Sequence, residues 1–554
     1  MNDSPFDALT RRQFGAGFLG SCSLALAGCL GDIVGGNDES GFRERGEERG
    51  FSYRGQEGGI GFGNSGVFIA DIDRDDRPEI VAIGGETPQL FDNDDGEFIK
   101  TTLLSDAFDP NITIQTAVFI DTNQDGWEDL ILFEKHGPAH IFENRGGVLE
   151  PAGWELPIEF VVPTSVACGD VTGNGYPDLF IAQMGDWADG VPAGWLRDEE
   201  EVGPLEEDNG APNYLLMNDG EDFSLAENRG IDGDRWSLAS SMVDLTGNGH
   251  VDIHVANDFN RDVIYLNAGG GRFEQHILPE ETDRNGMSSL VADITGNGLP
   301  DIFVTNIYFP LEELEDEEHD RLRRHVSFVL QSPRIEGNNL IVNEGDGEFS
   351  FQADEYGIAQ GGWGWAALAA DFDHDGDEEI FHVTQNLFEV YDPPIYTYPM
   401  YFKRDGDRFE RQDSAELGFT RGNDRAAVMS DLDGSGAMDL LVGTYNADFR
   451  LYENHHADGH CAQFDVRTED DAIAIGSTLT IEAGDSTYRR VLTSASDYQS
   501  QSTRTVHVGL GDADTIDQLT VRWPDTTESV HEDVEADSRW IIRPDAIEEA
   551  FSFS

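Results

Sequence analysis

One acidic nonapeptide recurs seven times in this chain, and this repeat constrains the fold more than any other feature. The copies span residues 71–79, 121–129, 170–178, 244–252, 293–301, 371–379 and 431–439. Each copy has an acid at positions one and nine and an oxygen-bearing side chain at positions three and five. Self-similarity at such a period indicates one supersecondary unit stacked against its own copies. The 554 residues therefore predict a single large array rather than several unrelated domains.

The segments around each copy read as β-strands. Short apolar stretches precede and follow the loops, as at 67–70 and 440–443. A second signature follows, with Asn and Gly residues that favour a tight hairpin, at 90–98, 215–223, 265–273, 341–349 and 401–409. Four strands per unit predict an all-β fold: a seven-bladed β-propeller with calcium loops, followed by a small β-sandwich-like domain. Because unit seven ends at 451–454 without its last strand, residues 51–53 are expected to complete it.

The spacing within the nonapeptide is typical of a hard-cation site. Calcium takes six to eight oxygen ligands, and a tight loop can direct side chains one, three and five inward while the ninth carboxylate closes the cage. Several Ca²⁺ sites are therefore predicted. Their candidate ligands are Asp71, Asp73, Asp75, Glu79, Asp121, Asn123, Asp125, Asp129, Asp170, Thr172, Asn174, Asp178, Asp244, Thr246, Asn248, Asp252, Asp293, Thr295, Asn297, Asp301, Asp371, Asp373, Asp375, Glu379, Asp431, Asp433, Ser435 and Asp439.

The loops differ in their number of carboxylates. The loops at 71 and 371 have four, those at 121 and 431 have three, and those at 170, 244 and 293 have two. We expect calcium affinity to follow that order, because charge count tunes such sites. For the two-carboxylate loops the alternative is a tight turn capped by its own Asp, with no metal.

Charge and cysteine content bound the partners. The chain has 109 acidic and 35 basic residues, a formal net charge of −74, and three lysines, Lys100, Lys135 and Lys403. This pattern resembles secreted proteins of extreme halophiles, and it argues against nucleic acid as a partner because phosphates would be repelled. Two cysteines remain beyond the first 29 residues, Cys168 and Cys461. Their pairing stays open, although the apolar surroundings of Cys168 favour a buried thiol.

The N-terminus resembles an export signal. Residues 10–15 include an arginine pair typical of twin-arginine signals, and an apolar stretch at 18–30 closes with Leu-Ala-Gly-Cys, which resembles a lipobox ending at Cys29. We expect a signal at 1–29, lipidation of Cys29, a flexible linker at 30–50, and a protein anchored to the outer face of the cell membrane. The alternative is a plain cleaved signal with an incidental cysteine.

Two family resemblances emerge from these motifs. The loops resemble FG-GAP/VCBS repeats, similar to the integrin α-chain propeller, and cover 51–455; Val-Ala-Asn-Asp-Phe at 255–259 and Gly-Trp-Gly-Trp at 362–365 resemble the cartilage acidic protein family. The ordered segments 474–477, 498–501, 507–511 and 521–524 resemble the ASPIC/UnbV domain, over 456–545. Asp525 stands where this domain usually has Gly, and the approach at 458–461 lacks the usual asparagines, so the domain boundary is less sharp than its identity.

Strand order predicts that the calcium loops share one face of the propeller and that insertions at 185–212, 307–337 and 387–399, with a surface helix at 311–330, lie on the other. Trp236, Trp363 and Trp365 are expected near that second face as partner contacts, or alternatively as plugs of the blade tops. The sequence favours a surface interaction or adhesion module for a protein or polysaccharide. A polysaccharide-active enzyme and a purely structural envelope component are the alternatives; no motif with fixed catalytic roles is present.

Overall fold

The structure is a computed structural model. It describes residues 41–55, 64–185, 187–188, 191–192, 210–231, 233–279, 282, 284–308, 337–385, 398–494 and 496–553. The expected signal with Cys29, the helix expected at 311–330 and most of the three insertions lie outside the described residues. No helix among the described residues is long and apolar enough to cross a lipid bilayer.

Seven four-stranded antiparallel units follow one another, each with a nonapeptide between its first and second strands. Among the described residues, two short helices, α2 (Leu103–Ala107) and α4 (Ala353–Tyr356), and a small hairpin of β12 (Trp187–Ala188) and β13 (Val191–Pro192) accompany them. In order from sheet one to sheet seven, the strands are β2 (Val67–Ala70), β3 (Glu79–Ala82), β4 (Gln89–Asp94), β5 (Glu97–Lys100); β6 (Ile114–Ile120), β7 (Asp129–Glu134), β8 (Ala139–Asn144), β9 (Leu149–Pro151); β10 (Pro163–Gly169), β11 (Asp178–Gln183), β14 (Tyr214–Asn218), β15 (Phe223–Leu225); β16 (Trp236–Val243), β17 (Asp252–Asp258), β18 (Val263–Asn267), β19 (Phe273–Ile277); β20 (Leu290–Ala292), β21 (Asp301–Val304), β22 (Asn339–Gly345), β23 (Glu348–Phe351); β24 (Gly364–Ala370), β25 (Glu379–Thr384), β26 (Met400–Asp405), β27 (Arg408–Arg411); and β28 (Asp424–Ser430), β29 (Asp439–Thr444), β30 (Arg450–Asn454), β1 (Phe42–Glu44).

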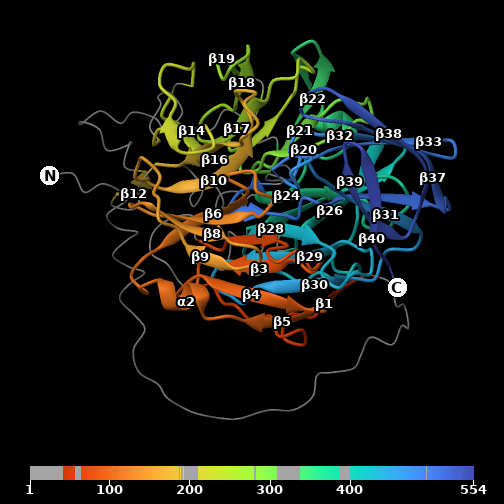
Figure 1. Ribbon diagram of the computed structural model, residues 1–554, viewed down its shortest axis with the longest axis horizontal. Helices are drawn as coiled ribbons and strands as arrows, with labels where there is room; N and C mark the ends of the chain where they lie inside the picture. Colours follow the sequence, from red (N-terminus) through yellow and green to blue (C-terminus); the bar gives the residue numbers. More distant parts are fainter. Residues whose placement is uncertain are drawn as a thin grey trace, which may run out of the picture. The chain divides into compact units, whose positions relative to one another are not determined.

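The first strands of these sheets lie side by side around a common centre (Figure 1). β2 contacts β6, β6 contacts β10, β10 contacts β16, β20 contacts β24, β24 contacts β28, and β28 returns to β2. Between sheets four and five, the Ser289 hydroxyl donates to the Ser241 hydroxyl at 2.8 Å. The inner strands are buried along their whole length in most sheets, as expected for strands covered on both faces. The β-propeller prediction is confirmed.

The last strand of sheet seven differs from the prediction. β1 (Phe42–Glu44), rather than residues 51–53, pairs with β30, and Phe42 lies opposite Asn454. The strand therefore lies inside the segment expected to be a linker. Phe42 is the residue that fixes it, because its ring is buried and stacks on Phe419 at 4.7 Å. Phe51 instead packs between sheets one and seven, 4.8 Å from the ring of Phe91.

The C-terminal region forms two four-stranded sheets over one hydrophobic cluster, as the sandwich prediction requires. Alternate residues of its strands, such as Leu479 and Ile481, are fully buried. The last strand ends at Ser552, beyond the predicted boundary at 545. The two sheets contain β36 (Val506–Gly511), β31 (His460–Val466), β39 (Ser538–Arg543), β40 (Ala546–Ser552), and β33 (Ser486–Val491), β32 (Thr478–Ala483), β37 (Thr515–Arg522), β38 (Glu528–Glu535).

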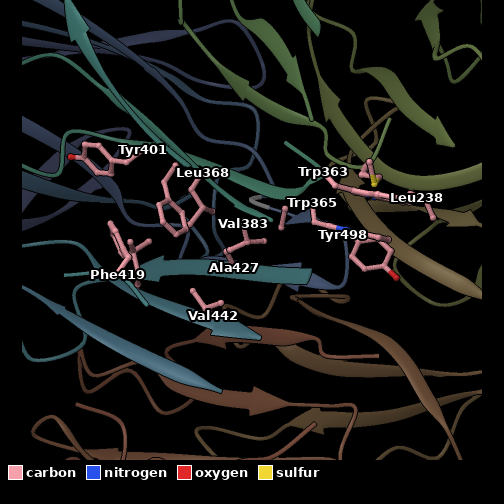
Figure 2. Packing of buried hydrophobic residues seen from close by; sticks show 14 of the residues in the cluster. Leu238, Trp363, Trp365, Leu368, Val383, Tyr401, Phe419, Ala427, Val442 and Tyr498 are labelled. Atoms are coloured by element: carbon pink, nitrogen blue, oxygen red, sulfur yellow. The ribbon is translucent and has the colours of Figure 1, made fainter. Parts of the chain in front are cut away.

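One hairpin of this C-terminal region leaves its own domain and enters the propeller. We call residues 496–501 the axial hairpin; it comprises β34 (Ser496–Asp497) and β35 (Ser500–Gln501), and β35 runs parallel to β2. The Asp497 carboxylate accepts N–H bonds from Ser289 at 3.1 Å and from Ala367 at 2.9 Å. The Tyr498 ring is fully buried, 4.7 Å from that of Trp365 (Figure 2). The hairpin thus bonds to inner segments of sheets one, five and six and fills the space between them.

Candidate metal centres

All seven nonapeptides share one hydrogen-bonded geometry. The first carboxylate accepts backbone N–H groups of positions five or six, as Asp121 does from Asp125 at 3.1 Å and Gly126 at 2.7 Å. The ninth carboxylate accepts an N–H from position two or three, as Asp178 does from Val171 at 2.9 Å. These bonds close each loop between the first and second strand of its sheet, where the sequence placed it.

Two of the seven loops bring three acidic side chains together. The ligand atoms of Asp71, Asp73 and Glu79 lie within 4.8 Å of one another, and so do those of Asp371, Asp373 and Glu379. These are the two four-carboxylate loops, and no such acidic group occurs among the described residues of the other five. Burial, reinforced by the neighbouring carboxylates, raises the pKa of both Glu79 and Glu379 to about 9. Such crowding is unfavourable unless a cation or a bound proton neutralises it.

The loop at 371 also contains unsatisfied oxygens. Asp371 Oδ1, Asp373 Oδ1 and Glu379 Oε1 are buried and have no hydrogen-bond donor. A buried carboxylate oxygen without a partner is costly, so three in one loop require an explanation. All three are hard oxygen donors, and they fit an ion of the calcium type better than a thiophilic metal.

A lysine modifies this loop in a way that the sequence analysis missed. Lys403 on β26 contacts the Asp373 carboxylate and lies 2.9 Å from Asp375 Oδ2. Burial would raise the pKa of Asp373, but hydrogen bonds from His456 and Lys403 hold it at about 2. In the loop at 71 the arginines contact groups other than the four predicted ligands: Arg74 pairs with Asp471, and Arg539 lies 4.0 Å from Asp76 Oδ1. The two four-carboxylate loops are therefore unequal, and the 71 loop has the larger uncompensated charge.

In the two-carboxylate loops, a hydrogen bond within the sheet takes the place of a bond to a metal ion. In each, the side-chain amide of the Asn at position five donates to the backbone carbonyl of the hairpin Asn in the same sheet. This bond ties the loop down without any ion, and it favours the alternative of a tight turn capped by its own Asp. The bonds run from Asn174 to Asn218 at 2.8 Å, from Asn248 to Asn267 at 3.3 Å and from Asn297 to Asn343 at 2.9 Å.

The three-carboxylate loops are intermediate. In the loop at 121 the Asn123 amide donates to Asp125 at 3.0 Å, so one predicted ligand binds another. In the loop at 431 the Asp431 carboxylate accepts the amide of Gln463, a residue of the C-terminal region, at 3.1 Å. In both loops, some of the predicted ligands therefore form hydrogen bonds with protein groups.

Family models match both the repeat region and the C-terminal region of the chain. A model described as FG-GAP-like repeat matches residues 71–132, 121–181, 244–304 and 328–382, and a model described as ASPIC and UnbV matches residues 467–549. The chain contains FG-GAP-like repeats and a C-terminal ASPIC/UnbV domain. No curated protein sequence matches the chain.

Two solved structures are similar at low identity. One is a chain of the crystal structure of BBS1N in complex with ARL6DN, soaked with lead, with a TM-score of 0.40 and 11% identity, covering 76% of this chain and 98% of that one. The other is YCF48 from Cyanidioschyzon merolae, with a TM-score of 0.37 and 10% identity, covering 75% of this chain and 99% of that one.

The FG-GAP-like loops are also the joints between neighbouring sheets. In six sheets the side-chain amide of the hairpin Asn donates to the carbonyl of position two in the preceding sheet's loop, and in sheet six Arg404 replaces the Asn. A change in one loop is therefore transmitted to the next sheet. The bonds join Asn93 to Leu432 at 3.0 Å, Asn144 to Ile72 at 2.8 Å, Asn218 to Thr122 at 2.8 Å, Asn267 to Val171 at 2.9 Å, Asn343 to Leu245 at 2.7 Å, Arg404 to Ile294 at 2.5 Å and Asn454 to Phe372 at 2.9 Å.

The ASPIC/UnbV domain contacts the propeller at these loops. Arg490 pairs with Glu378 at 3.2 Å, and Arg504 pairs with Glu128, both acids standing at position eight of their loops. Gly511 donates its N–H to the His374 carbonyl at 2.9 Å. The domain therefore covers part of the face on which the nonapeptide loops lie.

The three tryptophans proposed as partner contacts do not form an exposed surface. Trp236 and Trp365 are fully buried and Trp363 is 4% exposed, and all three belong to the central hydrophobic cluster. Figure 2 shows Trp363 and Trp365 within it. Their burial contradicts the partner-face prediction and supports the alternative that they fill the blade tops. The inner strands converge there, and large apolar side chains are drawn into that space.

Cys168 and Cys461 are both free and buried, so no disulfide joins them. The buried thiol expected at Cys168 is confirmed.

Proposed function

We propose that this chain is a calcium-binding surface lipoprotein that acts as an interaction or adhesion module for a protein or polysaccharide. The observation that carries the calcium part is the set of three unpartnered buried oxygens in the loop at 371. The similar acidic group at Asp71, Asp73 and Glu79 supports it.

Calcium would act here as a structural brace. Asp371, Asp373 and Glu379 would hold the ion in the loop of sheet six. A hydrogen bond joins that loop to the neighbouring sheet. Phe372, at position two, receives the amide of Asn454 from sheet seven. Neutralising the carboxylates therefore stabilises the joint between two sheets as well as the loop itself.

Two features favour binding over catalysis. The centre of a propeller is the usual place for a deep ligand site, and here the axial hairpin occupies it with Asp497 and Tyr498. The loop face is partly covered by the ASPIC/UnbV domain. We assign ligand binding to the insertions expected at 185–212, 307–337 and 387–399, most of which lie outside the described residues.

The enzyme alternative would need a catalytic group outside this filled centre. The purely structural alternative would show calcium-dependent stability with no saturable partner. Pull-down from envelope extracts separates these cases when performed with and without chelator, with released binders identified and then retested in purified form.

The calcium assignment is tested by calorimetric titration of the full chain, with magnesium as the control ion. Glu379→Gln is the informative variant because it removes one charge from the acidic group while keeping the side-chain shape. Glu378→Gln is its matched control, since that neighbouring acid pairs with Arg490 instead. We expect E379Q to weaken one calcium site at least about tenfold, or ~1.4 kcal/mol, and E378Q to leave that site unchanged. Identical titrations for both variants, or no calcium binding by the wild type, would overturn the assignment.

The lipid anchor is tested separately at Cys29. The mature N-terminus should begin at a lipidated Cys29, as read by mass spectrometry, and Cys29→Ser should release the protein from membranes. Release of both forms alike would show that the cysteine is incidental.

A further inference from the structure

A second cluster of metal-binding side chains lies where the ASPIC/UnbV domain meets sheet six. It consists of His374, Cys461 and His507, whose ligand atoms lie within 4.8 Å of one another and whose side chains are all buried. His374 comes from the FG-GAP-like loop, Cys461 from β31 and His507 from β36. The three residues are far apart in sequence and belong to two domains.

The backbone is arranged to bring these groups together. β31 and β36 pair so that Cys461 stands opposite Gly509 and Gln463 opposite His507. Cys461 and His507 are thus diagonal neighbours on one sheet. Gly509 permits the approach of the loop, because a Cβ there would lie 2.0 Å from Asp371 Oδ2 and 2.6 Å from His374 Cα.

The loop contributes His374 from a strained position. His374 stands at position four with a φ of 62°, in the left-handed region, where four of the other six loops have glycine. Arg74 and Gln124 have the same conformation at position four of their loops, with φ of 62° and 59°, so the loop itself sets this backbone geometry. The conformation directs the imidazole away from the carboxylates of its own loop and toward the ASPIC/UnbV domain.

The interatomic geometry fits one shared ion. The Nε2 atoms of His374 and His507 are 3.2 Å apart. Two nitrogens bound at ~2.0–2.1 Å to a tetrahedral zinc ion lie about 3.3–3.4 Å apart. His374 Nδ1 is 3.3 Å from the Gly459 carbonyl, which is the outer hydrogen bond that orients a metal-binding imidazole.

We propose that His374, Cys461 and His507 bind a thiophilic transition-metal ion of the Zn²⁺ class, which fastens the ASPIC/UnbV domain to sheet six of the propeller. Two imidazoles and a thiolate are ligands that zinc accepts and that calcium and magnesium do not favour. Binding displaces the thiol proton of Cys461 to solvent, and the fourth tetrahedral position is left to water. The carboxylates of Asp371 and Asp431 lie near the thiol and make the surroundings favourable for a cation.

The site is tested on the full chain in saturating calcium, so that the FG-GAP-like loops do not compete for the added ion. Zn²⁺ is titrated against a chromogenic zinc indicator, and Co²⁺ is used as a spectroscopic probe because a bound thiolate gives a charge-transfer absorption. We expect one tight equivalent of Zn²⁺, a thiolate–cobalt band, and a rise in the unfolding temperature on zinc addition.

Cys461→Ser should abolish the thiolate–cobalt band and weaken zinc binding at least about a hundredfold, because it removes a direct ligand. Cys168→Ser is the matched control, since it removes the other free buried thiol and should leave the band intact. His507→Gln tests the imidazole arm without altering the calcium loop. If the variants fail to fold, X-ray absorption at the cobalt edge of the wild type must show mixed nitrogen and sulfur ligands.

Absence of a tight equivalent in the wild type, or a cobalt spectrum shared by C461S and C168S, would overturn the proposal. In that case the 3.2 Å contact is a hydrogen bond between two neutral imidazoles. If the wild type binds Zn²⁺ at this site but binds no Ca²⁺, this inference stands and the proposed calcium function does not.

Discussion

Replacing Tyr498 by Ala should destabilise the whole folded unit, because this residue anchors the axial hairpin in the propeller. The Tyr498 side chain is fully buried and packs on Trp365. Deleting a buried aromatic ring costs ~3–5 kcal/mol from lost transfer energy and the remaining cavity. If about 500 residues unfold as one unit, the entropy of unfolding is roughly 1 kcal/mol per degree, so the unfolding temperature should fall by about 3–5 °C.

Differential scanning calorimetry in saturating calcium measures this shift. Tyr498→Phe is the matched control; it keeps the ring and should cost less than ~1.5 kcal/mol. If the hairpin withdraws in Y498A, the ASPIC/UnbV domain should also become more sensitive to limited proteolysis. An unfolding temperature equal to the wild type, or equal losses in the two variants, would refute the anchoring role.

Three further outcomes follow from the loop geometry. Lys403→Met should tighten calcium binding at the 371 loop by about tenfold, because it removes a competing cation, and titration calorimetry measures this change. Without calcium, the raised pKa of Glu79, about 9, means that the folded state holds a proton that the unfolded state releases near pH 4.5. That contribution to stability is present below pH 4.5 and is lost as the pH rises through about 9, whereas calcium affinity should rise with pH over the same range. Asn267→Ala should cost ~1–3 kcal/mol in denaturant unfolding, since it leaves the Val171 carbonyl without its bond from the next sheet.

Each of these has a control. Lys135→Met should leave every calcium site unchanged, because this lysine lies outside the loops; an equal effect would show a general charge effect. Proton release on calcium binding is measured by the buffer dependence of the binding enthalpy, and binding without release contradicts the pKa assignment. Asn111→Ala alters an exposed Asn and should change the free energy of unfolding by less than ~0.5 kcal/mol. If N267A loses no more stability than N111A, the bond from Asn267 to the Val171 carbonyl does not stabilise the fold.

The sequence predicts the propeller well because each unit repeats local signals. The nonapeptide has fixed spacing, and the flanking strands have a clear apolar character, so both can be recognised from the sequence alone. β1 was missed because it has three residues with a single buried apolar side chain, Phe42, in a segment of charged and glycine residues. Its position depends on pairing with β30, which no local pattern encodes.

The candidate sites were only partly predictable for a similar reason. Carboxylate counting identified the two loops that gather three acids, but it did not show that Lys403 neutralises one of them from a neighbouring strand. The axial hairpin reads as a polar turn, because Asp497 and Gln499 are hydrophilic. Both are nevertheless buried, since their side chains and backbone replace the partners of inner-strand N–H and C=O groups.

The ASPIC/UnbV domain neutralises part of the negative charge on the loop face of the propeller. The strands converge on a ring whose loop face is lined with acids, and such a face repels itself unless it is neutralised. The domain supplies part of that charge through Arg490 and Arg504, whose pairs with Glu378 and Glu128 are largely buried and so are weakly screened by salt. In the loop at 71 no lysine contacts the four predicted ligands, although Arg539 of the same domain lies 4.0 Å from the neighbouring Asp76. Because Lys403 competes for two predicted ligands of the 371 loop and no lysine does so in the 71 loop, we expect calcium to fill the 71 loop before the 371 loop.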